Sequence, residues 1–143
     1  MRNTTQSRMA IGAALLMSTF FLFSVDLAQA QSSSRMRATI PFGFYVGELL
    51  MPAGEYELQV LENGVARVFN QDTYASVMFN TVRSANPTRE FGSAQVIFNR
   101  YGEDYFLSEM WWAGHRDGAK PMPSKREHQL ARANTPVRIS VAR

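Results

Sequence analysis

Residues 94–112 (AQVIFNRYGEDYFLSEMWW) constrain the fold of this chain more than any other stretch. They predict two strands joined by a turn that contains Gly102. Side chains alternate between the two faces of a strand. In the second strand, the residues expected on one face are Tyr105, Leu107, Glu109 and Trp111, and those expected on the other are Phe106, Ser108, Met110 and Trp112. Both faces are mainly apolar, which is typical of a central ribbon covered on both sides.

Short strand patterns recur in the rest of the chain. A strand begins at Met36 and meets Pro41, which suits only an edge or an extended segment because proline has no N–H to donate. Residues 55–61, 65–69 and 74–82 predict a three-stranded meander, whose first hairpin turns at Asn63-Gly64. Residues 137–141 alternate again. About seven short strands predict an all-β fold, a small antiparallel sandwich or barrel.

One short C-terminal helix is expected within this all-β fold. Ser124 and Glu127 have the spacing of a capping box, and Thr135-Pro136 should stop the helix after Ala133. Residues 84–92 and 113–121 are predicted as long loops because glycine and proline punctuate them. In the turn Pro52-Ala-Gly54, proline presets one φ angle and glycine permits a positive one.

The N-terminus predicts export. Two arginines precede an apolar run over residues 9–25, and Ala28-Gln-Ala30 supplies the small residues of a signal peptidase site. Residues 1–30 are therefore expected to be a signal peptide, although an uncleaved membrane anchor is an alternative. Cleavage would leave a disordered leader at 31–36 and a single β domain at 37–143. It would also leave no transmembrane segment, and the protein would be periplasmic or extracellular.

Charge and cysteine content narrow the classes of partner and of chemistry. Residues 38–115 carry nine acids against four arginines, whereas residues 116–143 carry seven basic residues against two acids. The basic ends should pair with the acidic body, or else form a patch that meets an anionic envelope surface. Nucleic acid is not expected for an exported chain without a recognition motif. Cysteine is absent, which excludes thiol catalysis and cysteine-based metal sites.

Two groups of motifs carry a resemblance to a known family. The first is Ile40-Pro-Phe-Gly-Phe-Tyr-Val-Gly47 with Met51-Pro-Ala-Gly-Glu-Tyr56, and the second is Phe98-Asn-Arg-Tyr-Gly102 with Tyr105-Phe-Leu-Ser-Glu-Met-Trp111. They resemble a family of short exported bacterial proteins with Ile-Pro-Phe-x-Phe-x-Val-Gly, Pro-Ala-Gly-x-Tyr and Tyr-Phe-Leu-Ser-Glu motifs. The resemblance implies export and an all-β domain. It implies no reaction and no catalytic residue.

Glu109 is the candidate for chemistry, although no residue is assigned as catalytic. Its carboxylate lies among apolar residues, and such a setting raises a pKa unless an arginine pairs with the group. It could therefore act as a general acid or anchor a ligand in a pocket. The alternatives are a structural ion pair, with an arginine such as Arg100 or Arg67 as the partner, or plain solvent exposure beside a tryptophan.

Trp111, Trp112 and His115 are the candidate binding residues. Adjacent tryptophans point to opposite faces of a strand, so one should fill the core while the other is exposed or covered by the C-terminal segment. An exposed indole could stack on a sugar ring or a lipid. His115 and Asp117 could place two metal ligands together, with Glu109 or His128 as a third, but a structural zinc site normally has four ligands, so no metal and no cofactor are expected.

Two functional hypotheses follow. The first is a non-catalytic exported β domain that binds or scaffolds a component of the cell envelope, such as an anionic component or a glycan. The second is a small hydrolase or isomerase with a pocket around Glu109. A filled core favours the first hypothesis, and a closed cavity walled by Glu109 and a tryptophan favours the second.

Overall fold

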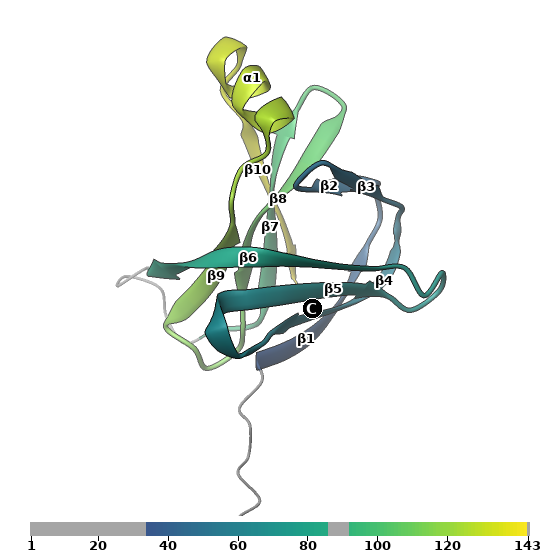
Figure 1. Cartoon of the computed structure of the whole chain (residues 1–143), viewed down its shortest axis with the longest axis vertical. Coiled ribbons are helices and arrows are strands. Elements are labelled where there is room, and N and C mark those ends of the chain that lie inside the picture. Colours follow the sequence, from purple (N-terminus) through teal and green to yellow (C-terminus); the bar gives the residue numbers. More distant parts are fainter. Residues whose placement is uncertain (1–33, 86–91, 143) are drawn as a thin grey trace, which may run out of the picture. The chain divides into compact units, whose positions relative to one another are not determined.

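Strands account for most of the residues that the structure describes. The structure is a computed structural model and describes residues 34–85 and 92–142, within the unit Ser32–Arg143. In these residues we observe ten strands, one α-helix and one 3-10 turn (Figure 1). The strands are β1 (Ser34–Ile40), β2 (Phe44–Val46), β3 (Leu49–Met51), β4 (Gly54–Val60), β5 (Val65–Asn70), β6 (Ser76–Ala85), β7 (Gln95–Tyr101), β8 (Asp104–Trp111), β9 (Asp117–Pro121) and β10 (Val137–Ala142). The helix is α1 (Lys125–Ala133) and the 3-10 turn is η1 (Glu62–Gly64). The predicted all-β fold with one short C-terminal helix is confirmed.

The strands form one continuous mixed sheet. Its main path runs β1-β4-β5-β6-β9-β8-β2-β3, and β7 pairs both β8 and β10. Strand β6 joins the strands β1, β4 and β5 to the rest of the sheet, because residues 76–80 pair with β5 and residues 81–85 pair with β9. At the other side β10 contacts β1, so the sheet curls back on itself. The barrel alternative therefore describes this sheet better than a sandwich of two separate sheets.

Strand β8 is central, as the sequence predicts. One of its edges pairs with β7 along its whole length. Its other edge pairs with β9 at Met110 and Trp111 and with β2 at Phe106. The pairing of β2 with β8 is parallel, so the sheet is not wholly antiparallel as expected.

The expectation of about seven strands is too low because three short strands lie where loops or longer strands were predicted. Gly47, at φ +62°, turns the chain between β2 and β3. Strand β9 occupies residues that were predicted as part of a loop. Its sequence, Asp-Gly-Ala-Lys-Pro, has low strand propensity, but the chain pairs with β6 on one side and β8 on the other. Pairing with two neighbours overrides local propensity.

The N-terminal boundary also differs from the expectation of a disordered leader over 31–36. Strand β1 begins at Ser34, which pairs with Val60 of β4, and Met36 is buried in the core. Met36 supplies an apolar side chain and the edge of β4 supplies hydrogen bonds, so these residues are ordered. The predicted signal peptide, residues 31–33 of the leader and residues 86–91 of the predicted loop lie outside the described residues.

The turns and the helix cap follow local rules. Asn63 and Gly64 have positive φ (73° and 74°) as predicted, although the connection between β4 and β5 spans four residues, 61–64, rather than two. Ser124 Oγ accepts the backbone N–H of Glu127 at 3.1 Å, which confirms the expected cap of α1. The Glu127 carboxylate does not complete a capping box and instead accepts a hydrogen bond from Asn99 of β7.

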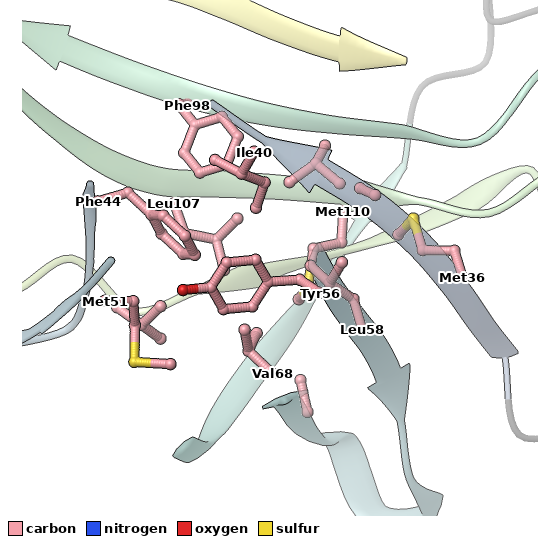
Figure 2. Packing of buried hydrophobic residues seen from close by; sticks show 14 of the residues in the cluster. Met36, Ile40, Phe44, Met51, Tyr56, Leu58, Val68, Phe98, Leu107 and Met110 are labelled. Carbon is pink, nitrogen blue, oxygen red and sulfur yellow. The ribbon is translucent and has the colours of Figure 1, made fainter. Parts of the chain in front are cut away.

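Large apolar and aromatic side chains fill the core. Figure 2 shows Tyr56 among Phe44, Met51 and Val68, with its hydroxyl on the side of Met51. That hydroxyl donates to the carbonyl oxygen of Pro52, which ties the Pro-Ala-Gly-x-Tyr turn to the core. The fully buried side chains of the cluster include Ile40, Phe44, Tyr56, Leu58, Val68, Val96, Phe98 and Met110. The side chains at the centre of the domain therefore pack against one another.

The turn before β4 requires glycine at position 54 for two reasons, a backbone angle and a close contact. Its φ is +155°, and a Cβ placed there would lie 2.7 Å from Oδ2 of Asp72. The same Asp72 oxygen accepts the backbone N–H of Glu55 at 3.0 Å, so it cannot move away without losing that bond. The turn therefore has a structural role, as its sequence predicted.

Candidate functional site

A β-bulge in β8 sets the directions of the candidate residues. Leu107 pairs with Phe98 and Glu109 pairs with Ile97, so Ser108 is an extra residue without a partner in β7. An extra residue of this kind exchanges the faces of the residues that follow it. Leu107, Met110 and Trp112 accordingly belong to the core.

The predicted assignment of faces is therefore wrong across the bulge. Glu109 and Trp111 were expected to share a face with Leu107, but they lie on the opposite, outer side of the sheet. The outer side here carries Lys120 of β9 and Arg138 of β10, which both reach Glu109. Lys120, Glu109 and Arg138 thus form a polar row on the outer side of the sheet, and the bulge turns Glu109 toward this row and away from the apolar core.

Glu109 is held by three neighbours. The indole N–H of Trp111 donates to Oε2 at 2.9 Å, Nη2 of Arg138 lies 3.0 Å from Oε1, and Nζ of Lys120 lies 4.0 Å from Oε1. The Glu109 side chain is only 10% exposed, whereas Arg138 and Lys120 are about half exposed. An ion pair was one expected alternative, and its partners are Arg138 and Lys120 rather than Arg100 or Arg67.

The pKa of Glu109 follows from these contacts. Burial by itself raises the pKa, but the hydrogen bonds from Trp111 and Arg138 and the charges of Arg138 and Lys120 outweigh burial and lower the pKa below its usual range. The carboxyl group is therefore ionised at neutral pH. A group in this state accepts hydrogen bonds and has no proton to donate.

Trp111 is buried on the outer side of the sheet, with 2% of its surface exposed. It pairs with Gly118 of β9, and a Cβ on Gly118 would lie 2.7 Å from Cδ2 of the indole. Glycine at this position therefore lets the ring lie against β9. Trp112 is also buried (5%), so neither ring is exposed, and of the two alternatives for the second tryptophan only the exposed one is wrong.

Trp112 and His115 lie together at the end of β8. The turn after β8 brings the backbone N–H of His115 within 3.3 Å of the carbonyl oxygen of Trp112, and the His115 side chain is exposed. Both residues line two shallow grooves of about 230 and 300 Å³, which also share Ser34. The indole N–H of Trp112 is buried without a hydrogen-bond partner, which is unusual for a buried donor.

The structure therefore divides the four candidate residues into two pairs. Glu109 and Trp111 form one hydrogen-bonded pair on the outer side, and Trp112 and His115 form the wall of the grooves at the end of β8. Arg83 and Asp117 form an ion pair beside one of these grooves. The hydrogen bond from Arg83 lowers the pKa of Asp117, and the charges of Arg83 and His115 add to this effect.

A larger groove of about 450 Å³ lies between α1 and the outer side of the sheet, and we call it the α1 groove. Its walls include Asn99, Tyr101, Ser108, Lys120, Glu127 and Arg138. Ser108 and Glu127 are both buried (6% and 7% exposed), and Nδ2 of Asn99 donates to Oε1 of Glu127 at 3.0 Å. Burial raises the pKa of Tyr101, and the nearby charge of Glu127 raises it further.

The sequence contains no pattern that predicts the α1 groove. Glu127 carried a signal as part of the capping box, but its carboxylate serves the sheet rather than the cap. Ser108 carried no signal, because a bulge has no fixed sequence pattern. Glu109 does not line this groove, but it orients Lys120 and Arg138, which do.

In residues 34–85 and 92–142 no three histidine, aspartate or glutamate side chains are grouped closely enough to hold a metal ion. No helix in the part of the chain that the structure describes is long and apolar enough to span a membrane. Comparisons with family models, with curated proteins and with solved structures gave no match to this chain.

Proposed function

We propose that this protein is a non-catalytic exported β domain that binds a component of the cell envelope. The observation that carries the proposal is the state of Glu109. Its carboxylate is ionised, buried and bound by Trp111, Arg138 and Lys120. The residue best suited to chemistry by sequence is thus used to organise the sheet and to position two cations beside the α1 groove.

The α1 groove is the proposed binding site. Its volume of about 450 Å³ falls within the range of about 300–1,000 Å³ that is usual for small-molecule sites. It combines buried polar groups, Ser108 and Glu127, with apolar walls that include Pro123 and Pro136. Small-molecule sites commonly have this mixture of an apolar lining and a few placed polar groups.

A basic patch for an anionic surface has less support. Arg35 and Arg37 lie 3.4 and 3.8 Å from the carboxylate of Glu57, and Arg126 lies 2.8 Å from that of Asp104. Part of the positive charge at the two ends of the domain is therefore paired within the domain, which supports the first of the two charge hypotheses.

The alternative, a hydrolase or isomerase centred on Glu109, also has less support. A general acid needs a proton at working pH and access to the substrate. Glu109 meets neither requirement. Its lowered pKa means that it is ionised at neutral pH, and it does not line the α1 groove, where a substrate could bind. Glu109→Gln should lower the melting temperature by several degrees without removing an activity; loss of an activity with unchanged stability would favour the enzyme.

Export is tested first. The protein purified from the periplasm or medium of the exporting cell should have a mass that corresponds to cleavage after Ala30. Recovery of the uncleaved chain in the membrane would instead support the membrane-anchor alternative.

Binding is tested by co-sedimentation of the exported protein with isolated envelope fractions. The variant Ala131→Trp places a bulky side chain on the wall of the α1 groove, and Ala131 is exposed, so the fold should tolerate it. Ala133→Trp is the matched control, because Ala133 is also an exposed residue of α1 but does not line the groove. We expect retention of the wild type and of Ala133→Trp and loss of retention for Ala131→Trp. The proposed function is wrong if no envelope fraction retains the wild type.

A further inference from the structure

We infer that the ligand of the α1 groove is a neutral saccharide. This inference rests on the proposed function and specifies the class of ligand for the same site. Three features support it: the balance of charge around the groove, the mixture of hydrogen-bond donors and acceptors, and the apolar surfaces between them.

The charges around the α1 groove cancel. Lys120 and Arg138 are its cations and Glu127 is a buried anion in its wall, while the other titratable residues of the lining are Tyr101 and the exposed His128. Glu109 supplies the second anion, because both cations lie within 4.0 Å of it. An added anion would compete with Glu109 and Glu127, and an added cation would compete with Lys120 and Arg138. A neutral ligand avoids both costs, because it leaves Glu109 paired with Lys120 and Arg138 and leaves Glu127 hydrogen-bonded to Asn99.

The groove also offers both kinds of hydrogen-bonding group. Ser108 presents a hydroxyl that can donate and accept, and its position at the bulge places it on the wall of the groove. Lys120 and Arg138 are donors, while the carboxylate of Glu127 is an acceptor. Saccharide hydroxyl groups donate and accept at once, so they match a wall on which donors and acceptors lie side by side.

Apolar surfaces separate these polar groups. Tyr101, Pro123, Ala131 and Pro136 line the same groove. The C–H groups on the faces of a sugar ring can pack on aromatic and proline surfaces, while the hydroxyl groups at the ring edge reach the polar residues. A wholly apolar ligand would instead leave buried polar groups such as Glu127 facing a surface with which they cannot form hydrogen bonds.

The test is calorimetric titration of the exported protein with four soluble probes. They are a tetrasaccharide of N-acetylglucosamine and maltotetraose as neutral saccharides, a heparin-derived tetrasaccharide as an anion, and spermine as a cation. We expect a neutral tetrasaccharide to bind most tightly, with an affinity that changes less than twofold between low and high salt, because salt screens only charged pairs. Tighter, salt-sensitive binding of the heparin fragment or of spermine would overturn the inference.

Three variants locate the binding. Ala131→Trp should weaken binding of the neutral tetrasaccharide at least tenfold, whereas Ala133→Trp should leave it within twofold of wild type. Ser108→Ala should weaken it about three- to tenfold, the usual effect of one lost hydrogen bond. Equal binding by Ala131→Trp and wild type would overturn the location.

The outcome also separates this inference from the proposed function. If envelope material is retained in a manner sensitive to Ala131→Trp but neither neutral tetrasaccharide binds, the saccharide inference is wrong and the proposed function stands. If neither the envelope fractions nor the saccharides bind, both are wrong.

Discussion

Trp111 and Trp112 are neighbours in the chain, but their indole rings lie in two different environments. Trp111 lies on the outer side of the sheet, and its N–H donates to Glu109. Trp112 belongs to the core cluster, and its N–H is buried without a partner. The two rings are almost equally buried, so burial alone does not distinguish them. What differs is polarity: the outer side of β8 satisfies polar groups, and the core side excludes them.

This difference indicates where each side of β8 can act. The outer side holds ion pairs, a bulge and the α1 groove, which together place polar groups at the proposed binding site. The core side holds side chains that contact one another and stabilise the sheet. Function is therefore expected on the side that also carries the polar row of Lys120, Glu109 and Arg138. The following predictions test that distinction, beginning with the largest effect.

Glu109→Ala should lower the free energy of unfolding by about 3 kcal/mol, because it removes the carboxylate that accepts the buried N–H of Trp111 and that pairs with two cations. The loss stays below the full cost of an isolated buried charge, since Arg138 and Lys120 are about half exposed and water screens them. Urea denaturation measures the change. A loss below about 0.5 kcal/mol would show that the outer row does not stabilise the sheet.

Trp111→Phe and Trp112→Phe make the same chemical change on the two sides. The first should cost about 2 kcal/mol, because it removes both ring volume and the N–H that binds Glu109. The second should cost about 1 kcal/mol or less, because the N–H it removes has no partner. The comparison is again made by urea denaturation. Equal losses, or a larger loss at Trp112, would contradict the assignment of a polar and an apolar side.

Stability should depend on pH through Glu109. The pKa of Glu109 is lowered in the folded protein. Its contribution to the free energy of unfolding is therefore fully present above the ordinary glutamate pKa of about 4.3, and it is lost as pH falls toward the pKa of the folded protein. The difference in unfolding free energy between wild type and Glu109→Gln should thus be constant from about pH 7 to pH 5 and shrink below that. Asp117 also has a lowered pKa, but it is present in both proteins and cancels in the difference. A difference that grows on acidification would mean that the pKa of Glu109 is raised.

His115→Ala should have the smallest effect, within about 0.5 kcal/mol, because the side chain is exposed at the end of β8. It should also leave binding by the α1 groove unchanged, because His115 does not line that groove. Calorimetric titration with the neutral tetrasaccharide measures this. Weaker binding by His115→Ala would move the binding site to the two grooves at Trp112.

The sequence predicted those parts of the structure that local rules control. Alternation predicted the meander and the central position of β8, and Asn63-Gly64 predicted a turn with positive φ angles. Ser124 predicted the cap of α1. Each of these features depends on residues within a few positions of one another, so it can be predicted from the short segment in which it occurs.

The candidate site was predicted less completely than the fold. Glu109, Trp111, Trp112 and His115 were identified as unusual residues, but their grouping into two pairs was not foreseen. Strand β9 was missed because its residues have low strand propensity and are ordered by two neighbouring strands. The partners of Glu109 come from β9 and β10, which lie far from it in the chain.

By itself the sequence determined an all-β chain with a central apolar ribbon, a Pro-Ala-Gly-x-Tyr turn and one capped helix. Only the tertiary structure decided which side of β8 each residue faces. The physical reason is that strands have a side-chain period of two, so one extra residue at Ser108 exchanges the two faces. No local pattern marks that residue, because the bulge exists only in the pairing of β8 with β7.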